Sequence, residues 1–447
     1  MKDTIKVKPT YGLVTAIAMI VGIVIGSGIY FKVDDILNFA GGNVWLGMLV
    51  IALGAVSIVF GSLSISELAL RSAASGGIFS YYERYIHPGL AASLGMFTAY
   101  VYLPTVVAVV TWVGANYTLG SNSSLEAQVG LGFLYLILLI LVNLFGRVIA
   151  GYFQSLSTMV KVVPLVLIAA IGLFWTGKGP SLSENISLIE PRDVGWGWLS
   201  GLVPLYFAYD GWTVVASIAP EIKSAKKNLP RALMAGPFII LVLYLLFFYG
   251  LNRILGPSFI MSTGNTAVTY AASYLFGDTI GRALMVIVII SVLGVSNGMM
   301  LGTMRLPQAF ASRGWIGSEK FARIHPKYQV SIAASLSVGL VTMFWLGIHY
   351  LVMKFNVLPG SDISEITIVF NNTSFIFLYL VVLGLYRKGE VKRKLTGLVA
   401  PILAIIGSLT LLVGSLMTNF VTVLGFMLFC LLFCLAAYGL YLKNKQK

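Results

Sequence analysis

Long apolar runs recur from one end of this chain to the other, and they restrict its fold more than any other feature. Each run holds about 18 or more residues, enough for a helix to cross ~30 Å of hydrocarbon. The 447-residue chain is 58% hydrophobic and only 10% charged, whereas soluble globular chains carry about 25% charged residues. The sequence therefore predicts an all-α membrane protein with twelve transmembrane helices. The predicted spans are 13–38, 44–66, 91–118, 129–146, 152–176, 197–219, 232–252, 280–303, 330–350, 366–386, 397–417 and 420–442.

The distribution of basic residues along the chain predicts its orientation. If the N-terminus is placed inside, most of the 30 basic residues fall in the alternate segments that face the cytoplasm, with dense groups at 223–231, 305–327 and 387–394. This asymmetry is the positive-inside rule of membrane proteins. We therefore expect a multi-pass protein of the cell membrane with residues 1–12 and 443–447 in the cytoplasm. The net charge of +14 then reflects topology and does not indicate nucleic-acid binding.

Two short glycine-containing breaks interrupt otherwise apolar spans. Gly26-Ser27-Gly28 lies about halfway along the first span, and Tyr209-Asp210-Gly211 lies about halfway along the sixth. Interrupted helices at corresponding positions of two halves are typical of transporter binding sites. A break at this depth frees backbone amides and carbonyls that only a ligand, an ion or neighbouring protein can satisfy.

The positions of the two breaks predict an inverted repeat. Helices 1–5, within residues 13–176, and helices 6–10, within residues 197–386, each begin with a broken helix. Five crossings per half place the second half upside down relative to the first. Helices 11 and 12, within residues 397–442, are uniformly apolar and are expected to pack at the periphery.

The first break has the backbone chemistry of a carboxylate site. Unwinding exposes the amides of Ser27, Gly28 and Ile29 at the start of an outer half-helix, whose positive dipole end favours an anion. Freed carbonyls near Val24 are expected to accept hydrogen bonds from an ammonium group. The alternative is that the spacing from Gly22 to Gly26 only allows two helices to approach closely.

The second break is expected to complete the ammonium site through the carbonyls of the stretch from Phe207 through Ala208 to Asp210. Asp210 itself has two interpretations. A carboxylate inside the membrane is a functional residue by default, but Asp also caps the N-terminus of helices, and we favour the cap. Phe207 and Tyr209 flank the break and are candidates for an aromatic lid over the ligand.

Lys161 is the one basic residue deep in the predicted membrane core. It lies about ten residues into the fifth span, roughly 15 Å deep at 1.5 Å per residue. Because an unpaired charge at this depth is costly, its ammonium should meet carbonyls, Asp210 or a cavity. It is either a structural tether between helices, a built-in cation that replaces a coupling sodium ion, or a proton carrier.

The remaining polar features give weaker signals. The cluster Asn371-Asn372-Thr373-Ser374 is expected either to hydrogen-bond between helices or to line the outer vestibule. Cys430 and Cys434 are expected to pack in the last span rather than to form a disulfide. The three histidines form no metal-ligand cluster and no phosphate-binding loop is present, so we expect no catalytic residue, metal or cofactor.

Several strings together resemble the amino acid–polyamine–organocation (APC) superfamily and, within it, the L-type amino acid transporter (LAT) family. The resemblance rests on the first break, on the stretch around the second break, on the fifth-helix lysine Lys161, and on matching strings in the second helix, the inner loops and helix eight. These strings are Gly26 to Tyr30, Ser66 to Leu68, Ser75 to Gly77, Phe207 to Trp212, Pro220-Glu221, Asn228 to Pro230, Ser296 to Gly298, Arg305 and His325-Pro326.

The resemblance implies the LeuT-type five-plus-five inverted-repeat fold and sodium-independent exchange of L-amino acids. It implies a carboxylate site on Gly26, Ser27 and Gly28, and an ammonium site on carbonyls of Val24, Phe207 and Asp210, with Phe207 as the gating aromatic. The loop between helices three and four lacks the cysteine of the heteromeric members. We therefore expect no disulfide-linked heavy subunit, and a likeness to bacterial exchangers of alanine, serine, threonine and cysteine.

Our leading hypothesis is an antiporter of small neutral L-amino acids that works by alternating access. The main alternative is a proton-coupled symporter of the same fold, in which Lys161 titrates. A third hypothesis, an intramembrane aspartyl protease, needs two carboxylates that share a site. The other Gly-Asp pair, Gly277-Asp278, falls in an outer segment, which argues against that chemistry.

Overall fold

The structure is a computed structural model that describes residues 9–72, 76–120, 123–145, 147–177, 179–180, 187–358, 362–418 and 420–446. Within these ranges the regular structure is helical, and the one strand-like contact among them is a single parallel bridge between Tyr11 and Ile222. The prediction of an all-α protein is confirmed.

Ten helical stretches in the described part of the chain are long and apolar enough to cross a membrane. Several consist of two or three segments joined end to end. Their bounds are α4 (Val44–Arg71), α6 (Pro88–Phe97) with the π-helical turn η1 (Thr98–Tyr102) and α7 (Leu103–Leu119), α8 (Leu125–Phe145), α9 (Arg147–Leu173), α11 (Ala225–Leu255), α14 (Asp278–Thr303) with α15 (Leu306–Ala311), α17 (Ile332–Lys354), α18 (Ile363–Ser374) with α19 (Ile376–Arg387), η5 (Leu395–Val399) with α20 (Ala400–Thr418), and α21 (Phe420–Lys445).

Two further sets of short helices take the places of the first and sixth predicted spans. The first set is α1 (Leu13–Val24), α2 (Ser27–Phe31) and α3 (Val33–Phe39). The second set is α10 (Leu202–Ala208), preceded by the 3-10 helix η2 (Gly195–Gly201) and followed by the 3-10 helix η3 (Trp212–Glu221). The predicted interruption of helices 1 and 6 is therefore confirmed, although the second half of helix 6 is 3-10 rather than α-helical.

The ends of the long helices follow local sequence. Asn43 and Asp362 accept hydrogen bonds from first-turn amides of α4 and α18 through their side chains, which satisfies donors that a helix leaves free. Gly120 and Gly256 follow α7 and α11 with φ of 83°, a conformation that residues with a Cβ rarely adopt. Short helices occupy the connections: α5 (Phe79–Tyr85), α12 (Pro257–Thr263), η4 (Gly264–Thr266), α13 (Ala267–Phe276) and α16 (Glu319–Ala322).

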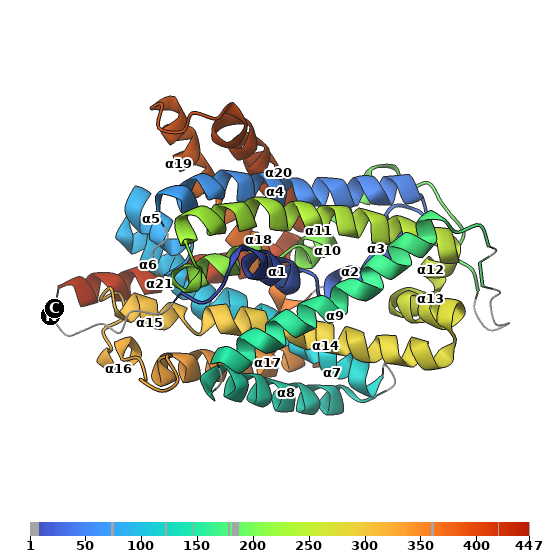
Figure 1. Ribbon diagram of the computed structural model, residues 1–447, viewed down its shortest axis with the longest axis horizontal. Coiled ribbons are helices and arrows are strands. Elements are labelled where there is room, and N and C mark those ends of the chain that lie inside the picture. Colours follow the sequence, from blue (N-terminus) through green and yellow to red (C-terminus); the bar gives the residue numbers. More distant parts are fainter. Residues whose placement is uncertain are drawn as a thin grey trace.

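The interrupted helices lie in the middle of the bundle (Figure 1). α1 packs against α11, α9 and α14, and α10 packs against α2, α4 and α18. α20 and α21 lie at the outside, where α20 packs on α4 and α21 on α6. In α21, Cys430 and Cys434 are both buried and free, as predicted.

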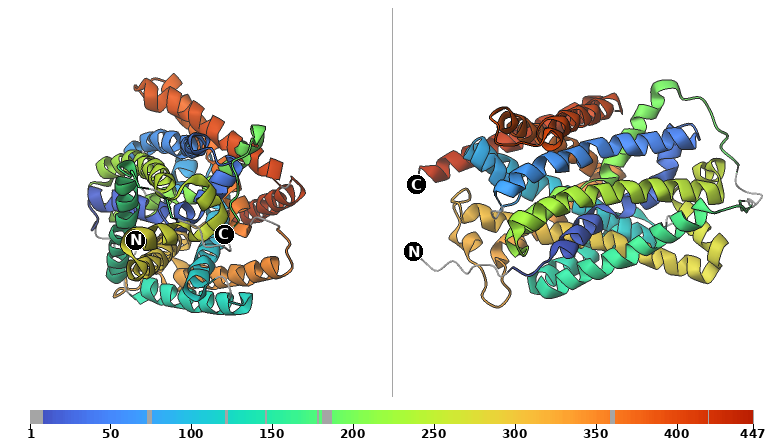
Figure 2. Two further views of the ribbon diagram at one scale, coloured as in Figure 1. Left: turned by 90° about the vertical axis from the view of Figure 1, so that its right-hand side faces the viewer. Right: turned by 45° about the horizontal axis from the view of Figure 1, so that its top comes forward.

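Both described ends of the chain lie at the same end of the bundle (Figure 2). The amides of Thr10 and Tyr11 donate to the carbonyl of Glu221 at the end of η3. Close to the C-terminus, Asn444 donates to the carbonyl of Trp315, in the connection between α15 and α16. This arrangement agrees with an even number of crossings.

Candidate functional site

The first break is short. α1 ends at Val24, Ile25 is extended, and Gly26 has φ −141° and ψ −144° before α2 begins at Ser27. The outer half-helix therefore starts two residues earlier than the predicted start near Ile29. The first amides of a helix have no partner within that helix, so the backbone N–H groups of Ser27, Gly28 and Ile29 are the donors that α2 itself leaves unpaired.

The second break depends on one glycine. α10 ends at Ala208, and Gly211 adopts φ of 90° before η3 begins. A Cβ on Gly211 would lie 2.7 Å from Cγ2 of Ile23 and 2.9 Å from Cε of Met299. Both the left-handed conformation and the close approach of α1 therefore require glycine at this position.

The two breaks touch each other. A Cβ on Gly28 would lie 2.6 Å from Cα of Ala208 and 2.8 Å from its Cβ, so the two backbones are in contact there. The hydroxyl of Tyr244, on α11, lies 2.7 Å from the carbonyl oxygen of Ala208 and 3.3 Å from that of Val24. One buried hydroxyl thus reaches a carbonyl of each break.

Lys161 joins α9 to both halves of the first interrupted helix. Its side chain is fully buried, and its ammonium donates to the carbonyl of Gly22, in the last turns of α1. Its own backbone carbonyl accepts a hydrogen bond of 2.6 Å from the hydroxyl of Tyr30, on α2. Of the three partners considered for this ammonium, the structure gives it a backbone carbonyl.

Asp210 does not cap η3, so the favoured interpretation was wrong. Gly211 stands at the N-cap position, where no side chain makes a capping hydrogen bond. Asp210 instead accepts a 2.6 Å hydrogen bond from the hydroxyl of Tyr102 through Oδ1. Its Oδ2 is buried and has no hydrogen-bond partner among the described residues. Tyr102 closes the π-helical turn η1, a local irregularity that is frequent at functional sites.

The two aromatic residues that flank the second break lie in different surroundings. Tyr209 is fully buried, donates to the carbonyl of Ile51 on α4 at 3.2 Å, and places its ring 5.0 Å from that of Tyr244. Its side chain therefore packs inside the bundle, and its role as a lid stays a prediction. Phe207 is half-buried, and its role as a lid stays a prediction as well.

The polar cluster in α18 lines a cavity and makes an interhelical hydrogen bond. Asn371 lines a cavity of about 20 Å³ together with Tyr102, with Ser217 of η3 and with Leu306 of α15. The outer-vestibule interpretation of this cluster stays a prediction. Ser374 accepts a 2.8 Å hydrogen bond from Tyr82 through its carbonyl, which agrees with the interhelical interpretation.

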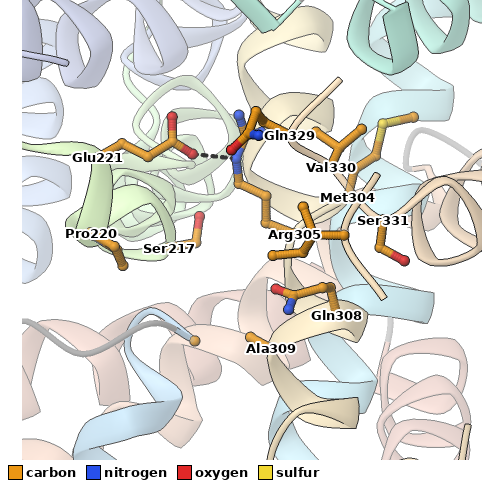
Figure 3. A pocket seen from close by; sticks show the side chains of 12 residues that line it. Ser217, Pro220, Glu221, Met304, Arg305, Gln308, Ala309, Gln329, Val330 and Ser331 are labelled. Carbon is orange, nitrogen blue, oxygen red and sulfur yellow. Dashed lines mark hydrogen bonds and ion pairs between the residues drawn. The ribbon is translucent and has the colours of Figure 1, made fainter. Parts of the chain in front are cut away.

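A second cavity, of about 60 Å³, lies next to the first and shares Ser217 with it. Figure 3 shows Glu221 from the end of η3 and Arg305 from the start of α15 reaching toward each other beside it. Oε1 of Glu221 lies 2.6 Å from Nε of Arg305. The Glu221 carbonyl also receives the amides of the N-terminal segment. Glu221 therefore joins η3 to α15 through its side chain and to the segment before α1 through its carbonyl.

Sequence reasoning missed the two tyrosines that organise the site. Tyr244 and Tyr102 come from the seventh and third predicted spans, and nothing in the sequence near either one distinguishes it from the other tyrosines of the chain. Their roles depend on which helices pack beside the breaks. The breaks themselves and Lys161 could be found because glycine and a buried charge are unusual at that depth.

Comparison with known proteins adds the family. A sequence model of the family described as "Amino acid permease" matches residues 11–442. The chain belongs to the amino acid permease family. The resemblance to the APC superfamily is thus confirmed, as are the predictions of a multi-pass membrane protein and of a transporter rather than an enzyme.

Three relatives give the range of similarity within this amino acid permease family. The chain is 27% identical over 424 residues to the serine/threonine exchanger SteT of Bacillus subtilis, with 92% of each chain covered. It is 29% identical over 356 residues to the mouse large neutral amino acids transporter small subunit 2. It is 28% identical over 348 residues to the human Asc-type amino acid transporter 1. These matches cover 76% and 75% of this chain, and 65% of each mammalian relative.

Proposed function

We propose that this permease is a sodium-independent antiporter of small neutral L-amino acids, which it binds at the contact between its two helix breaks. The observation that carries the proposal is that contact itself. Gly28 lies against the backbone of Ala208, and Tyr244 faces the carbonyls of both breaks. A ligand at this point meets donors from one break and acceptors from the other, as a zwitterion requires.

The carboxylate of the substrate is assigned to the first break. Free backbone amides of Ser27, Gly28 and Ile29 point from the start of α2, and the dipole of the half-helix favours negative charge there. Gly26 and Gly28 carry no side chain, so a ligand can approach the backbone closely. Lys161 lies beside this break and adds positive charge to its surroundings.

The ammonium group is assigned to carbonyls of both breaks. Val24, Phe207 and Asp210 supply these carbonyls, and Ala208 and Tyr209 form the turn between the last two. The unpaired Oδ2 of Asp210 adds an acceptor that a buried ammonium would stabilise. Phe207 is then the gate that covers the bound substrate.

Independence from sodium is assigned to Lys161. Its ammonium donates to an α1 carbonyl next to the first break, while Tyr30 of α2 binds its backbone carbonyl. The fixed cation braces α1, and the backbone carbonyl of the same residue holds α2; carbonyls at a broken helix coordinate the sodium ion in a sodium-driven transporter of this design.

Exchange and substrate class are supported by the relatives. The name of the Bacillus protein describes a serine/threonine exchanger, and the mammalian names describe a large neutral amino acids transporter small subunit and an Asc-type amino acid transporter. Among the described residues of the two breaks, Asp210 is the one charged side chain. A neutral side chain on the substrate therefore fits the site better than a cationic or acidic one.

A second candidate function is a proton-coupled symporter of the same fold. The buried Oδ2 of Asp210 and the buried ammonium of Lys161 are two groups that a transported proton can occupy. This alternative uses the same substrate site and differs only in what drives transport.

For assembly and orientation, we propose a chain in the cell membrane with both termini in the cytoplasm and no disulfide-linked heavy subunit. The basic segments support this orientation. The loop between α7 and α8 contains no cysteine in the sequence, so it offers no thiol for an intersubunit disulfide.

A counterflow panel tests the substrate class and the role of sodium. Proteoliposomes loaded with unlabelled serine are given each of the twenty labelled L-amino acids, in sodium and in choline buffer. We expect uptake of alanine, serine, threonine and cysteine, with equal rates in both buffers. Uptake that is confined to charged amino acids, or that needs sodium, would overturn the proposal.

A further inference from the structure

A third and larger cavity lies away from the breaks. It has a volume of about 460 Å³ and shares no lining residue with the two cavities beside η3. Three segments that are far apart in the sequence meet there: the C-terminal end of α4, the N-terminal part of α11, and the link from α19 to η5. The lining residues are Ser66, Glu67, Leu70, Arg71, Lys227, Pro230, Arg231, Met234, Glu390, Lys392, Arg393 and Thr396.

One acidic residue of this cavity is already neutralised by its neighbours. Glu67 is buried, and its Oε2 lies 2.9 Å from Nη1 of Arg71, while the hydroxyl of Thr396 donates to its Oε1 at 2.5 Å. Arg71 also donates to the carbonyl of Glu390 at 2.8 Å. Glu67, Arg71 and Thr396 therefore form a closed network that fixes the link before η5 against α4.

Four further cations at this cavity have no such partner. Lys227, Arg231, Lys392 and Arg393 are exposed, and none of them forms an ion pair with an acidic side chain among the described residues. The one other acidic side chain that lines the cavity belongs to Glu390, which is exposed. Four cations converge on a single hollow, so an anion bound there would relieve their mutual repulsion.

The position of the cavity indicates the kind of anion. It lies where long apolar helices end, on the face that the basic segments assign to the cytoplasm. Leu70 lines it and is 48% exposed, and Leu395, next to Thr396, is 54% exposed. Met234 adds a further apolar side chain to the lining. Cations beside exposed apolar side chains at a helix end suit a ligand with a charged head and an apolar tail.

We propose that this cavity binds the phosphate group of an anionic phospholipid from the cytoplasmic leaflet. Lys227 and Arg231 approach the phosphate from α11, and Lys392 and Arg393 approach it from the link before η5. The acyl chains leave along Leu70 and Met234. The lipid then connects α11 to the link that the Glu67 network holds against α4. This inference concerns a site separate from the transport pathway and stands independently of the proposed substrate.

The test measures lipid binding to the full-length chain in an uncharged detergent. Phosphatidylglycerol and phosphatidylcholine with the same acyl chains are titrated separately, and the thermal midpoint and the number of lipids retained in native mass spectrometry are recorded. We expect phosphatidylglycerol to raise the midpoint and to remain bound, whereas phosphatidylcholine does neither. Equal effects of the two lipids would overturn the proposal.

Charge removal localises the effect to this cavity. Each basic residue near a membrane surface contributes about 1 kcal/mol to the attraction of anionic lipid, so the triple variant Lys227→Gln, Arg231→Gln, Lys392→Gln should bind phosphatidylglycerol roughly 100-fold more weakly. The matched control removes three exposed cations of the same proposed face outside the cavity: Lys320→Gln, Arg323→Gln, Lys443→Gln. We expect this control to bind like the unmodified chain. Equal losses in both variants would show a diffuse charge effect and contradict the site.

A double variant with fewer substitutions controls for loss of folding in the triple variant. Lys392→Gln with Arg393→Gln alters only exposed side chains in the link before η5, and we expect binding to weaken about 30-fold. Unchanged binding in this variant would overturn the assignment. The last measurement uses inorganic phosphate in place of lipid. If phosphate at millimolar concentration raises the thermal midpoint and displaces the lipid, the cavity holds a soluble anion and the lipid assignment is wrong.

Discussion

The two helix breaks differ in what holds them in place. The first is a two-residue gap between α-helices, braced by Lys161 and Tyr30 across α9. The second break contains a single left-handed glycine, Gly211, and continues as a 3-10 helix. This 3-10 helix ends at the ion pair between Glu221 and Arg305. We infer that the first break is a fixed binding shell, whereas the second can change its hydrogen bonds when the site opens.

The same contrast appears in the use of polar atoms. At the first break, the buried ammonium of Lys161 has a carbonyl partner. At the second break, one oxygen of Asp210 has no partner among the described residues. A buried polar group that has a partner favours one arrangement, whereas an unsatisfied buried oxygen favours a ligand or a change of partner. Substitutions at the two breaks should therefore have different consequences.

The largest effect is expected for Lys161→Ala. The change leaves the carbonyl of Gly22 buried without its donor and removes the brace on α1, which costs about 1–3 kcal/mol. We expect the exchange rate in proteoliposomes to fall roughly 100-fold while the protein still inserts and purifies.

Adding sodium to the Lys161→Ala variant distinguishes between two roles of Lys161, a built-in cation and a structural tether. If Lys161 replaces a coupling ion, sodium should restore part of the lost rate in Lys161→Ala. Exchange at the unmodified rate would remove Lys161 from the mechanism. Lys320→Ala, an exposed lysine, is the matched control and should exchange normally.

Gly28→Ala tests the contact between the breaks. The added methyl would lie 2.6 Å from the backbone of Ala208, and overpacking of this kind costs about 1–3 kcal/mol. We expect about a 30-fold loss in apparent substrate affinity, measured by counterflow at varied concentration. Gly130→Ala in α8, where a Cβ meets nothing within 4 Å, should have no effect. Similar behaviour of the two variants would mean that the breaks are not in functional contact.

Asp210→Asn tests the free oxygen at the second break. The amide retains an acceptor for the hydroxyl of Tyr102 but loses the charge that is assigned to the substrate ammonium, a contribution of about 1.5 kcal/mol. We expect about a tenfold loss of apparent affinity. The control is Asp278→Asn, at the start of α14, which should leave exchange unchanged. Unaltered affinity in Asp210→Asn would show that Asp210 serves only to bind Tyr102 and does not contact the substrate.

Tyr244→Phe gives the smallest expected effect. It removes one hydroxyl that faces both breaks, a neutral hydrogen bond worth about 1 kcal/mol, so the exchange rate should fall about fivefold. Tyr379→Phe is the matched control, since the buried hydroxyl of Tyr379 has no partner among the described residues. Equal effects of the two changes would show that the bridging geometry is irrelevant.

The fold was largely predictable because its signals are local. Apolar runs longer than about 18 residues identify membrane helices, and glycine within such a run marks the breaks at Gly26 and Gly211. Lys161 could be found because a buried ammonium is rare at that depth. The segment that follows Gly211 was expected to be α-helical but is a 3-10 helix. Its internal proline does not explain the difference, since α9 and α11 are α-helical and also contain proline.

The roles of site residues that depend on which helices pack together could not be predicted from the sequence. Asp210 was interpreted as a cap because Asp precedes a helix start, but the left-handed Gly211 takes that position and turns the carboxylate toward Tyr102. Tyr209 was interpreted as a lid because it adjoins the break, yet α4 offers its hydroxyl a carbonyl. The bridging position of Tyr244 follows from the packing of α11 alone.

The central claim is that substrate is exchanged at the two breaks without an external driving ion, and one measurement tests it most directly. Purified protein in proteoliposomes is given labelled serine in sodium-free buffer, with or without internal unlabelled serine and with or without an inward proton gradient. The account predicts uptake only into loaded vesicles, one molecule in for each molecule out, with no response to the gradient. Uptake into empty vesicles that follows the proton gradient would contradict it and establish the symporter instead.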